Sequence, residues 1–318
     1  MNVLAADLAH YSKAYNVFVE KTGKHTSDQK WAEENFPAAV VHKLGEIRPS
    51  DHTLRSLGVG SGSGEYDIIL LRMLSQRFSR FNHVVLEPAR VYLEEFQSTV
   101  AKESSSGEWS VPGAANFEWH NETLEEYMAK KNDHSSEGSP QQFDFISAVH
   151  SLYYVDEVRV ALQFLYGSLA PGGTLLTTLL KDTSSYTDTS SVTAQEVTKE
   201  NYTSSTKVKR VLTELDIPFT ISEQRVSADI TSIFDQGSAE GNLLLDFLTH
   251  VGHFRETATK EMEEAVLTRF RKQAREYRVA TRADAKPGFA GAAHCDPDGD
   301  NERILIERIW ENVIITKA

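Results

Sequence analysis

The chain is 318 residues long, with 40% hydrophobic residues and a formal net charge of −13. This excess of acid argues against a nucleic-acid-binding protein, because phosphate contacts need clustered lysine and arginine. Cys295 is the one cysteine, which excludes an intramolecular disulfide and indicates a reducing compartment. The first residues are too polar for a signal peptide, and no run approaches the roughly 18 apolar residues of a membrane span. We therefore expect a cytoplasmic protein that does not bind membranes.

Hydrophobic periodicity predicts an N-terminal helical part and then alternating strands and helices. Helices are predicted at 5–20, 27–45, 65–78, 89–102, 156–169, 207–215, 243–249 and 260–280, and a short one after a capping box at Thr123. Strands are predicted at 53–58, 82–87, 116–120, 143–149, 174–180 and 219–225, with a last strand region at 303–310 and 313–316. Pro171-Gly172-Gly173 predicts a turn, and the Ser/Thr-rich residues 182–206 predict a surface segment.

The alternation from 53 to 180 predicts an α/β fold, in which right-handed crossovers place helices on both faces of a parallel sheet. Ligands of such sheets bind outside the carboxyl ends of the strands. We expect an N-terminal helical substrate lid at 1–50 and a cofactor-binding core at 51–182. The remaining strands and a substrate-binding lobe are expected at 183–318.

The first predicted strand leads into Gly58, Gly60, Gly62 and Gly64, and a helix follows at once. Glycines let a ligand approach the backbone without a Cβ in the way, and the helix N-terminus favours anionic groups. The dinucleotide pattern G-x-G-x-x-G is not met, which disfavours a nicotinamide oxidoreductase. The pattern G-x-G-x-G-x-G resembles the first motif of class I S-adenosylmethionine (SAM) methyltransferases. A glycine-rich loop without a cofactor is the alternative.

Three further motifs lie where strands end. Glu87 ends the second strand, where an acid can accept hydrogen bonds from both ribose hydroxyls, or simply face solvent. Thr123 follows the third strand, where such folds usually hold adenine, and it is equally explained as a helix cap. His150 ends the fourth strand, beside Tyr153 and Tyr154, where a methyl acceptor would lie next to the cofactor. A histidine there is either catalytic or structural.

Longer runs make the resemblance specific. H-S-L-Y-Y-V-D-E-V at 150–158, F-E-W-H-N-E-T at 117–123 and G-N-L-L-L-D-F-L-T at 241–249 are similar to the histamine N-methyltransferase family. The resemblance covers nearly the whole chain. It implies a Rossmann-like, seven-stranded, mostly parallel sheet with a small substrate-binding lobe. It also implies that SAM is the methyl donor, with S-adenosylhomocysteine as product, and that the methyl acceptor is a small molecule. We expect the enzyme to be monomeric.

The resemblance also implies the site residues. Together with the glycine loop it gives a cofactor site of Gly58, Gly60, Gly62, Glu87, Tyr92, Thr123, Leu124 and Val149. At Tyr92 the family pattern has a glutamine instead. The implied aromatic substrate pocket comprises Tyr11, Tyr15, Phe18, Tyr153, Tyr154 and Phe234. We expect no metal site, because Cys295 and His294 have no second thiol and 296–300 lacks the EF-hand spacing.

Two departures bear on the substrate. Family members hold the histamine ammonium with an acid on the N-terminal segment, where this chain has Lys24 with His25 beside it. The family's amide after the fourth strand is His150 here, and its C-terminal asparagine aligns near Ile309. Like charges repel, whereas a lysine suits a carboxylate. We therefore predict an imidazole or amine that carries a carboxylate, such as histidine or carnosine, unless Lys24 points into solvent.

The alternatives are histamine itself as the substrate, or an O-methyltransferase of the same fold that acts on a small acid. A non-catalytic SAM-binding protein is disfavoured by the intact glycine loop and Glu87. In the preferred interpretation, His150 orients the acceptor ring or accepts its departing proton. An acceptor imidazole is largely neutral at pH 7, so its methylation needs no strong base.

Overall fold

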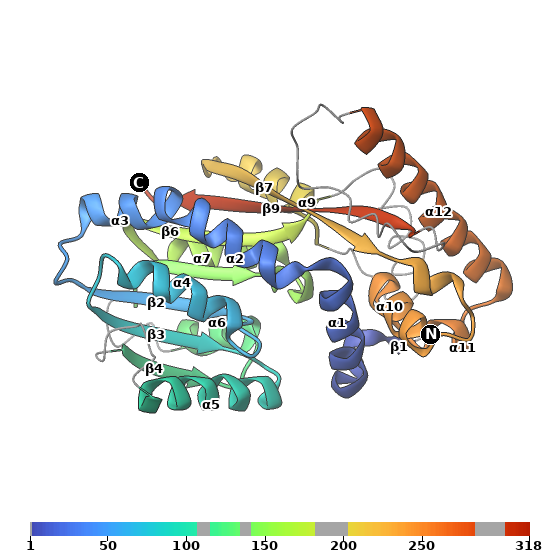
Figure 1. Cartoon of the computed structure of the whole chain (residues 1–318). Helices are drawn as coiled ribbons and strands as arrows, with labels where there is room; N and C mark the ends of the chain where they lie inside the picture. Colours follow the sequence, from blue (N-terminus) through green and yellow to red (C-terminus); the bar gives the residue numbers. More distant parts are fainter. Residues whose placement is uncertain (1, 107–114, 134–140, 182–202, 284–302) are drawn as a thin grey trace. The chain divides into compact units, whose positions relative to one another are not determined.

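The computed structural model describes residues 2–106, 115–133, 141–181, 203–283 and 303–318 (Figure 1). Most of the predicted surface segment 182–206, Cys295 and residues 296–300 lie outside the described residues. The chain divides into two compact units. The sheet unit comprises 26–181, 203–224 and 310–318, and the accessory unit comprises 1–25, 182–202 and 225–309.

The sheet unit alternates strands and helices. Its strands are β2 (Thr53–Val59), β3 (Arg80–Leu86), β4 (Ala115–His120), β5 (Phe143–Val149), β6 (Leu169–Leu180), β7 (Phe219–Asp229) and β9 (Leu305–Thr316). Its helices are α2 (Lys24–Glu34), α3 (His42–Ile47), α4 (Glu65–Ser75), α5 (Arg90–Ser106), α6 (Leu124–Asp133), α7 (Val158–Gly167) and α9 (Ser205–Glu214). Residues of α2, β7 and β9 belong partly to each unit.

The seven strands form one sheet in the order β4-β3-β2-β5-β6-β9-β7. Strand β2 pairs in parallel with β3 and β5, β3 pairs in parallel with β4, and β5 pairs in parallel with β6. Strand β9 pairs antiparallel with β6, so the last strand of the chain lies inside the sheet. The predicted seven-stranded, mostly parallel sheet is therefore confirmed.

Helices cover both faces of this sheet, as predicted (Figure 1). Leu54 and Phe145 point to the face on which α2, α3 and α4 contribute buried apolar residues. Leu57 and Ile146, at positions of opposite parity in β2 and β5, point to the other face, where α6, α7 and α9 pack. Because side chains alternate along a strand, each inner strand stabilises two cores.

Three local predictions need comment. The predicted helix 27–45 is divided into α2, a π-helical segment (Pro37–Val41) and α3, because Pro37 lacks the N–H that continues the helix. The residues of the predicted turn, Pro171-Gly172-Gly173, lie within β6 as an irregularity of the strand, where Gly172 has φ +74° and the register to β5 shifts. There Gly172 donates to the Lys317 carbonyl and Lys317 to that of Gly173. The capping box is confirmed: Thr123 N donates to Glu126 Oε2 and Glu126 N to Thr123 Oγ1.

The accessory unit contains α1 (Leu8–Thr22), α10 (Ala239–Thr249), α11 (Phe254–Thr257) and α12 (Lys260–Ala283), with β1 (Asn2–Val3) paired antiparallel to β8 (Val251–Gly252). Helix α1 begins after Asp7, whose carboxylate accepts from His10 N, and it ends at Gly23 with φ +59°. It packs on α10, where Tyr11, Tyr15 and Phe18 surround Phe247. None of the helices in the described ranges combines the length and apolarity needed to cross a membrane.

Candidate active site

The carboxyl ends of the four consecutive parallel strands β2, β3, β4 and β5 meet at one edge of the sheet. The register pairs Val59 with Leu86 and Leu86 with His120, so the glycine loop, Glu87 and the segment after β4 follow side by side. Gly60 N and Ser61 N both donate to the Leu86 carbonyl, which closes the loop against the next strand. The parallel sheet therefore brings together three motifs that are distant in the sequence.

The glycine loop needs its glycines for specific reasons. Gly60 has φ +62°, and a Cβ there would lie 2.5 Å from Ser151 Cβ. Gly64 has φ +80°, and a Cβ there would enter the Phe96 ring. At Gly62, with φ +56°, an added Cβ would meet nothing within 4 Å. Two glycines thus allow close packing with the protein itself, and Gly62 leaves open space.

Glu87 is buried, with a relative exposure of 6%. Its Oε2 accepts from Gly62 N at 2.7 Å, and its Oε1 accepts from Ala89 N at 2.8 Å. Burial raises the pKa of Glu87, these two hydrogen bonds oppose the shift, and the Asp67 carboxylate adds to it. The alternative of a solvent-facing acid is excluded. The carboxylate retains further lone pairs that could accept from a bound ligand.

Two polar residues at this edge were not predicted as site residues from the sequence. The Asn121 amide donates to the carbonyls of Glu87 and Pro88 at 3.0 and 2.8 Å, and so links the ends of β3 and β4. Asp67, buried in the first turn of α4, accepts from Ser147 Oγ at 2.8 Å, while its Oδ2 would lie 2.4 Å from a Cβ at Gly58. Asp67 stands among apolar residues in 65–71, and this contrast could have identified it as a candidate from the sequence.

His150 directly follows β5 and has φ +55°, which is uncommon for a residue with a side chain. Its N–H donates to the Thr178 carbonyl. Its ring is stacked against Tyr153 with 6.3 Å between centroids and meets Trp310 edge-on at 5.4 Å. Tyr153 Oη accepts from Leu180 N at 2.6 Å, which holds that ring in place. The backbone turn thus presents the imidazole beside two aromatic rings.

The other predicted cofactor and acceptor residues of the sheet unit lie at the same edge or on its flanking helices. Val149 is half-buried at the end of β5, and Leu124 is buried at the start of α6. Tyr92 lies half-buried in the first turn of α5. Tyr154 is more than half exposed and crosses Tyr153 edge-on at 6.2 Å.

The remaining predicted substrate residues belong to the accessory unit. Tyr11 and Tyr15 stack with each other and lie 6.0 and 5.8 Å from the Phe247 ring. Phe234 lies in a short 3₁₀ helix, and the Arg271 guanidinium is 4.6 Å above its ring. His25 is exposed. Lys24 is 8% exposed, so it does not point into solvent.

The comparisons with known proteins agree with this architecture. The sequence model of the methyltransferase domain family matches residues 29–216, more than half of the chain. Histamine N-methyltransferase of Mus musculus is 26% identical over 272 residues, covering 84% of this chain and 88% of that protein. The enzyme of Danio rerio is 27% identical, covering 83% and 88%.

Among solved structures, the YcgJ protein from Bacillus subtilis is 13% identical and covers 87% of this chain and 98% of its own, with a TM-score of 0.48. At that score the fold assignment rests on the observed strand order rather than on the superposition. The chain belongs to the methyltransferase domain family and is a class I SAM-dependent methyltransferase, similar over most of its length to the histamine N-methyltransferases.

Proposed function

We propose that the protein methylates a nitrogen of a small imidazole or amine metabolite, and that this acceptor carries a carboxylate. The observation that carries the proposal is the arrangement at the carboxyl edge of the sheet, where the glycine loop follows β2, Glu87 follows β3 and His150 follows β5. The similarity to histamine N-methyltransferases supports an acceptor of this chemical class.

The residues at this edge fit SAM. Open space at Gly62 allows a ligand to approach the backbone, and Glu87 can accept from ribose hydroxyls beyond its two main-chain hydrogen bonds. The buried carboxylates of Glu87 and Asp67 favour a cationic ligand over an anionic one. We assign cofactor contacts to Gly58, Gly60, Gly62, Glu87, Tyr92, Thr123, Leu124 and Val149.

SAM supplies a methyl group on a sulfonium that is already a good leaving group. The protein therefore acts mainly through proximity and orientation of the acceptor nitrogen. His150 orients the acceptor or takes the proton that the methylated nitrogen releases. Tyr153 and Tyr154 of the sheet unit suit a planar ring and developing positive charge. We propose Tyr11, Tyr15, Phe18 and Phe234 of the accessory unit as further substrate residues.

Lys24 supports the carboxylate on the acceptor. Lys24 is 8% exposed and stands where the resemblance places the acid that holds the histamine ammonium. A carboxylate on the acceptor is suited to this position and histamine, which is cationic, is not. We propose His25, exposed next to Lys24, as a further substrate-binding residue.

Histamine itself is the second candidate, and Asp28 favours it. Asp28 lies one helical turn after Lys24 in α2, on the same helix face, and is 4% exposed. Its Oδ1 accepts from Gln224 Nε2 at 2.9 Å, and the Gln224 amide in turn accepts from Asn312 Nδ2 at 3.1 Å. A buried acid therefore lies on the N-terminal segment, which supports histamine as the alternative acceptor.

The deciding experiment incubates the purified full chain with methyl-labelled SAM and histamine, histidine, carnosine or imidazole acetate. Transfer to the carboxylate-bearing imidazoles but not to histamine is the expected result. Efficient transfer to histamine would support the Asp28 alternative and contradict the role of Lys24. Tight SAM binding without transfer to any of the four would contradict an imidazole acceptor.

A further inference from the structure

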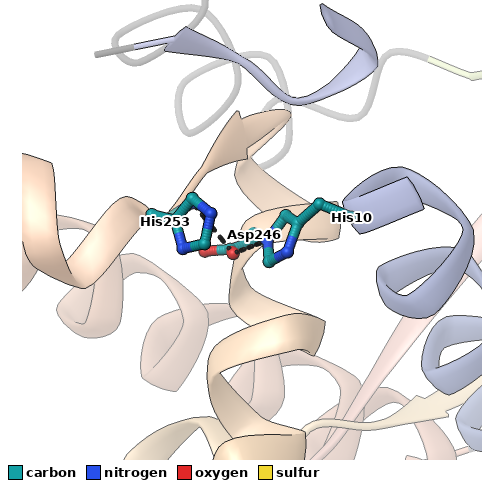
Figure 2. A group of neighbouring side chains, drawn as sticks. All are labelled: His10, Asp246 and His253. Carbon is teal, nitrogen blue, oxygen red and sulfur yellow. Dashed lines mark hydrogen bonds and ion pairs between the residues drawn. The ribbon is translucent and has the colours of Figure 1, made fainter. Parts of the chain in front are cut away.

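A cluster of metal-ligating side chains lies in the accessory unit, and none of its members belongs to the proposed cofactor site. His10 lies on α1, Asp246 on α10, and His253 immediately before α11 (Figure 2). One ligand atom from each of the three residues lies within 4.8 Å of the other two. Three separate segments thus converge on two imidazoles and one carboxylate.

The carboxylate of Asp246 is held in place by the main chain. It is 4% exposed, its Oδ1 accepts from Phe254 N at 2.8 Å, and its Oδ2 accepts from His253 N at 3.0 Å. His253 has φ +53°, which turns the chain so that two successive N–H groups reach the same carboxylate. A ligand oriented by outer hydrogen bonds in this way is typical of metal sites.

The two imidazoles lie next to this carboxylate. His10 Nε2 is 2.6 Å from Asp246 Oδ2, and the rings of His10 and His253 stack with 4.1 Å between centroids and 23° between planes (Figure 2). Helix positions explain the convergence, because α1 packs along α10 and Tyr11, next to His10, contacts Phe247, next to Asp246. His253 Nδ1 lies 3.7 Å from Glu256 Oε1, an outer carboxylate for this ring.

We propose that His10, Asp246 and His253 bind one divalent transition-metal ion of the Zn²⁺ type. Two imidazole nitrogens and one carboxylate oxygen are ligands that Zn²⁺ prefers, and a water completes four-coordination. Ca²⁺ and Mg²⁺ are disfavoured, because they prefer oxygen ligands. A bound ion would take the place of the proton between His10 Nε2 and Asp246 Oδ2. The His253 ring would rotate out of its stack on His10, because an imidazole binds a metal through a nitrogen lone pair that lies in the ring plane.

Such an ion would fasten α1 to the α10–α11 segment. His253 is half exposed and His10 partly so, which leaves a path for the ion from solvent. Helix α1 also carries Tyr11, Tyr15 and Phe18, so the ion would fix the helix that presents these aromatic residues. The inference does not depend on the proposed acceptor, since the three ligands are outside the proposed cofactor and acceptor residues.

The test titrates Zn²⁺ into the full chain by isothermal titration calorimetry, on a C295S background that removes the one thiol. We expect one ion per chain and a higher thermal midpoint with the ion bound, since a ligand that binds the folded state stabilises it. His253→Asn removes one ligand at an exposed position, and asparagine tolerates positive φ. We expect it to weaken Zn²⁺ binding by more than about tenfold, the lower end of what loss of an outer-shell partner costs.

A control variant, a second ligand variant and a second metal ion complete the test. His42→Asn changes an exposed histidine at the start of α3 and should leave Zn²⁺ binding unchanged. His10→Gln removes a second ligand from a different helix and should weaken binding as His253→Asn does. No saturable binding to the parent chain, or equal affinity in the parent and both ligand variants, would overturn the proposal. Mg²⁺ at the same concentrations should give no saturable heat.

Discussion

Two buried carboxylates at opposite edges of the same sheet have different environments. Asp144, near the start of β5, accepts from Arg48 Nε, His52 Nε2 and Arg55 N, each at 2.9 Å. Burial alone would raise the pKa of Asp144, but these three hydrogen bonds outweigh it and lower the pKa. Glu87, after the end of β3, accepts from two main-chain N–H groups, and burial raises its pKa.

The difference separates a structural acid from a candidate ligand-binding acid. At the amino edge, cationic side chains offset the charge of Asp144 and join the segment before β2 to β5. At the carboxyl edge, main-chain dipoles fix the position of Glu87 while its burial still disfavours the charge. The charge of a buried ligand-binding carboxylate is expected to be incompletely offset by the protein, because donors of the ligand complete its hydrogen bonds.

The largest expected effect comes from Asp144→Asn. It leaves Arg48 and His52 beside a neutral group, and removal of one partner of a buried ion pair typically costs about 3–5 kcal/mol of unfolding free energy. Urea unfolding at pH 7 measures this cost. Asp156→Asn, at an exposed position, should change the free energy by less than about 0.5 kcal/mol. SAM affinity under native conditions should be unchanged, and a parallel loss of SAM affinity would contradict the division between the two edges.

The lowered pKa of Asp144 also fixes the sign of a pH effect. The unfolded value is about 3.9, so the stabilisation is present above that pH and is lost as pH falls through the lower folded value. The difference in unfolding free energy between the parent chain and Asp144→Asn should therefore shrink as the pH is lowered below about 4. A difference that stays constant down to pH 3 would assign the effect to packing instead of charge.

His150→Ala probes the carboxyl edge at the acceptor. We expect kcat to fall about 100-fold, at the lower end of general acid–base effects, while the Kd for SAM stays within about twofold. Single-turnover kinetics and calorimetry measure the two quantities separately. His42→Ala serves as the control, because His42 is exposed and belongs to α3. An equal loss of turnover and of SAM affinity would refute a role on the acceptor side.

Glu87→Gln probes the same edge at the cofactor. Hydrogen bonds to charged groups contribute about 1.5–3 kcal/mol, so the Kd for SAM should rise roughly 10- to 100-fold. The raised pKa of Glu87 means that its charge costs stability at pH 7, but the glutamine NH2 would face one of the two main-chain N–H groups. The unfolding free energy should therefore fall by no more than about 1–3 kcal/mol. Exposed Glu94→Gln is the matched control in the neighbouring helix. A large loss of stability with unchanged SAM affinity would make Glu87 structural, like Asp144.

Lys24→Gln gives the smallest expected effect. Loss of one charged contact to the acceptor should raise KM for a carboxylate-bearing acceptor by about tenfold, near 1.4 kcal/mol, and should leave KM for SAM unchanged. Lys13→Gln, on the exposed side of α1, is the control. If KM for histamine falls in the Lys24 variant while KM for the carboxylate-bearing acceptors is unchanged, Lys24 repels cationic acceptors but does not bind the acceptor carboxylate.

The sequence by itself determined the sheet and the glycine loop, because both depend on short-range patterns. Alternating strands and helices require a parallel sheet, and the glycine spacing after β2 permits the tight turn with positive φ at Gly60, Gly62 and Gly64. The position of Glu87 at a strand end followed from the same logic, since Pro88 stops the strand.

Only the tertiary structure decided which polar residues are buried and with whom. The burial of Asp28 and Asp67, and the convergence of His10, Asp246 and His253, depend on packing between segments up to 243 residues apart in the numbering (253 − 10), which no local pattern encodes. The same holds for Lys24, whose sequence position left exposure open and whose side chain is buried. Local patterns set the backbone, whereas burial of a charge is a property of everything that surrounds it.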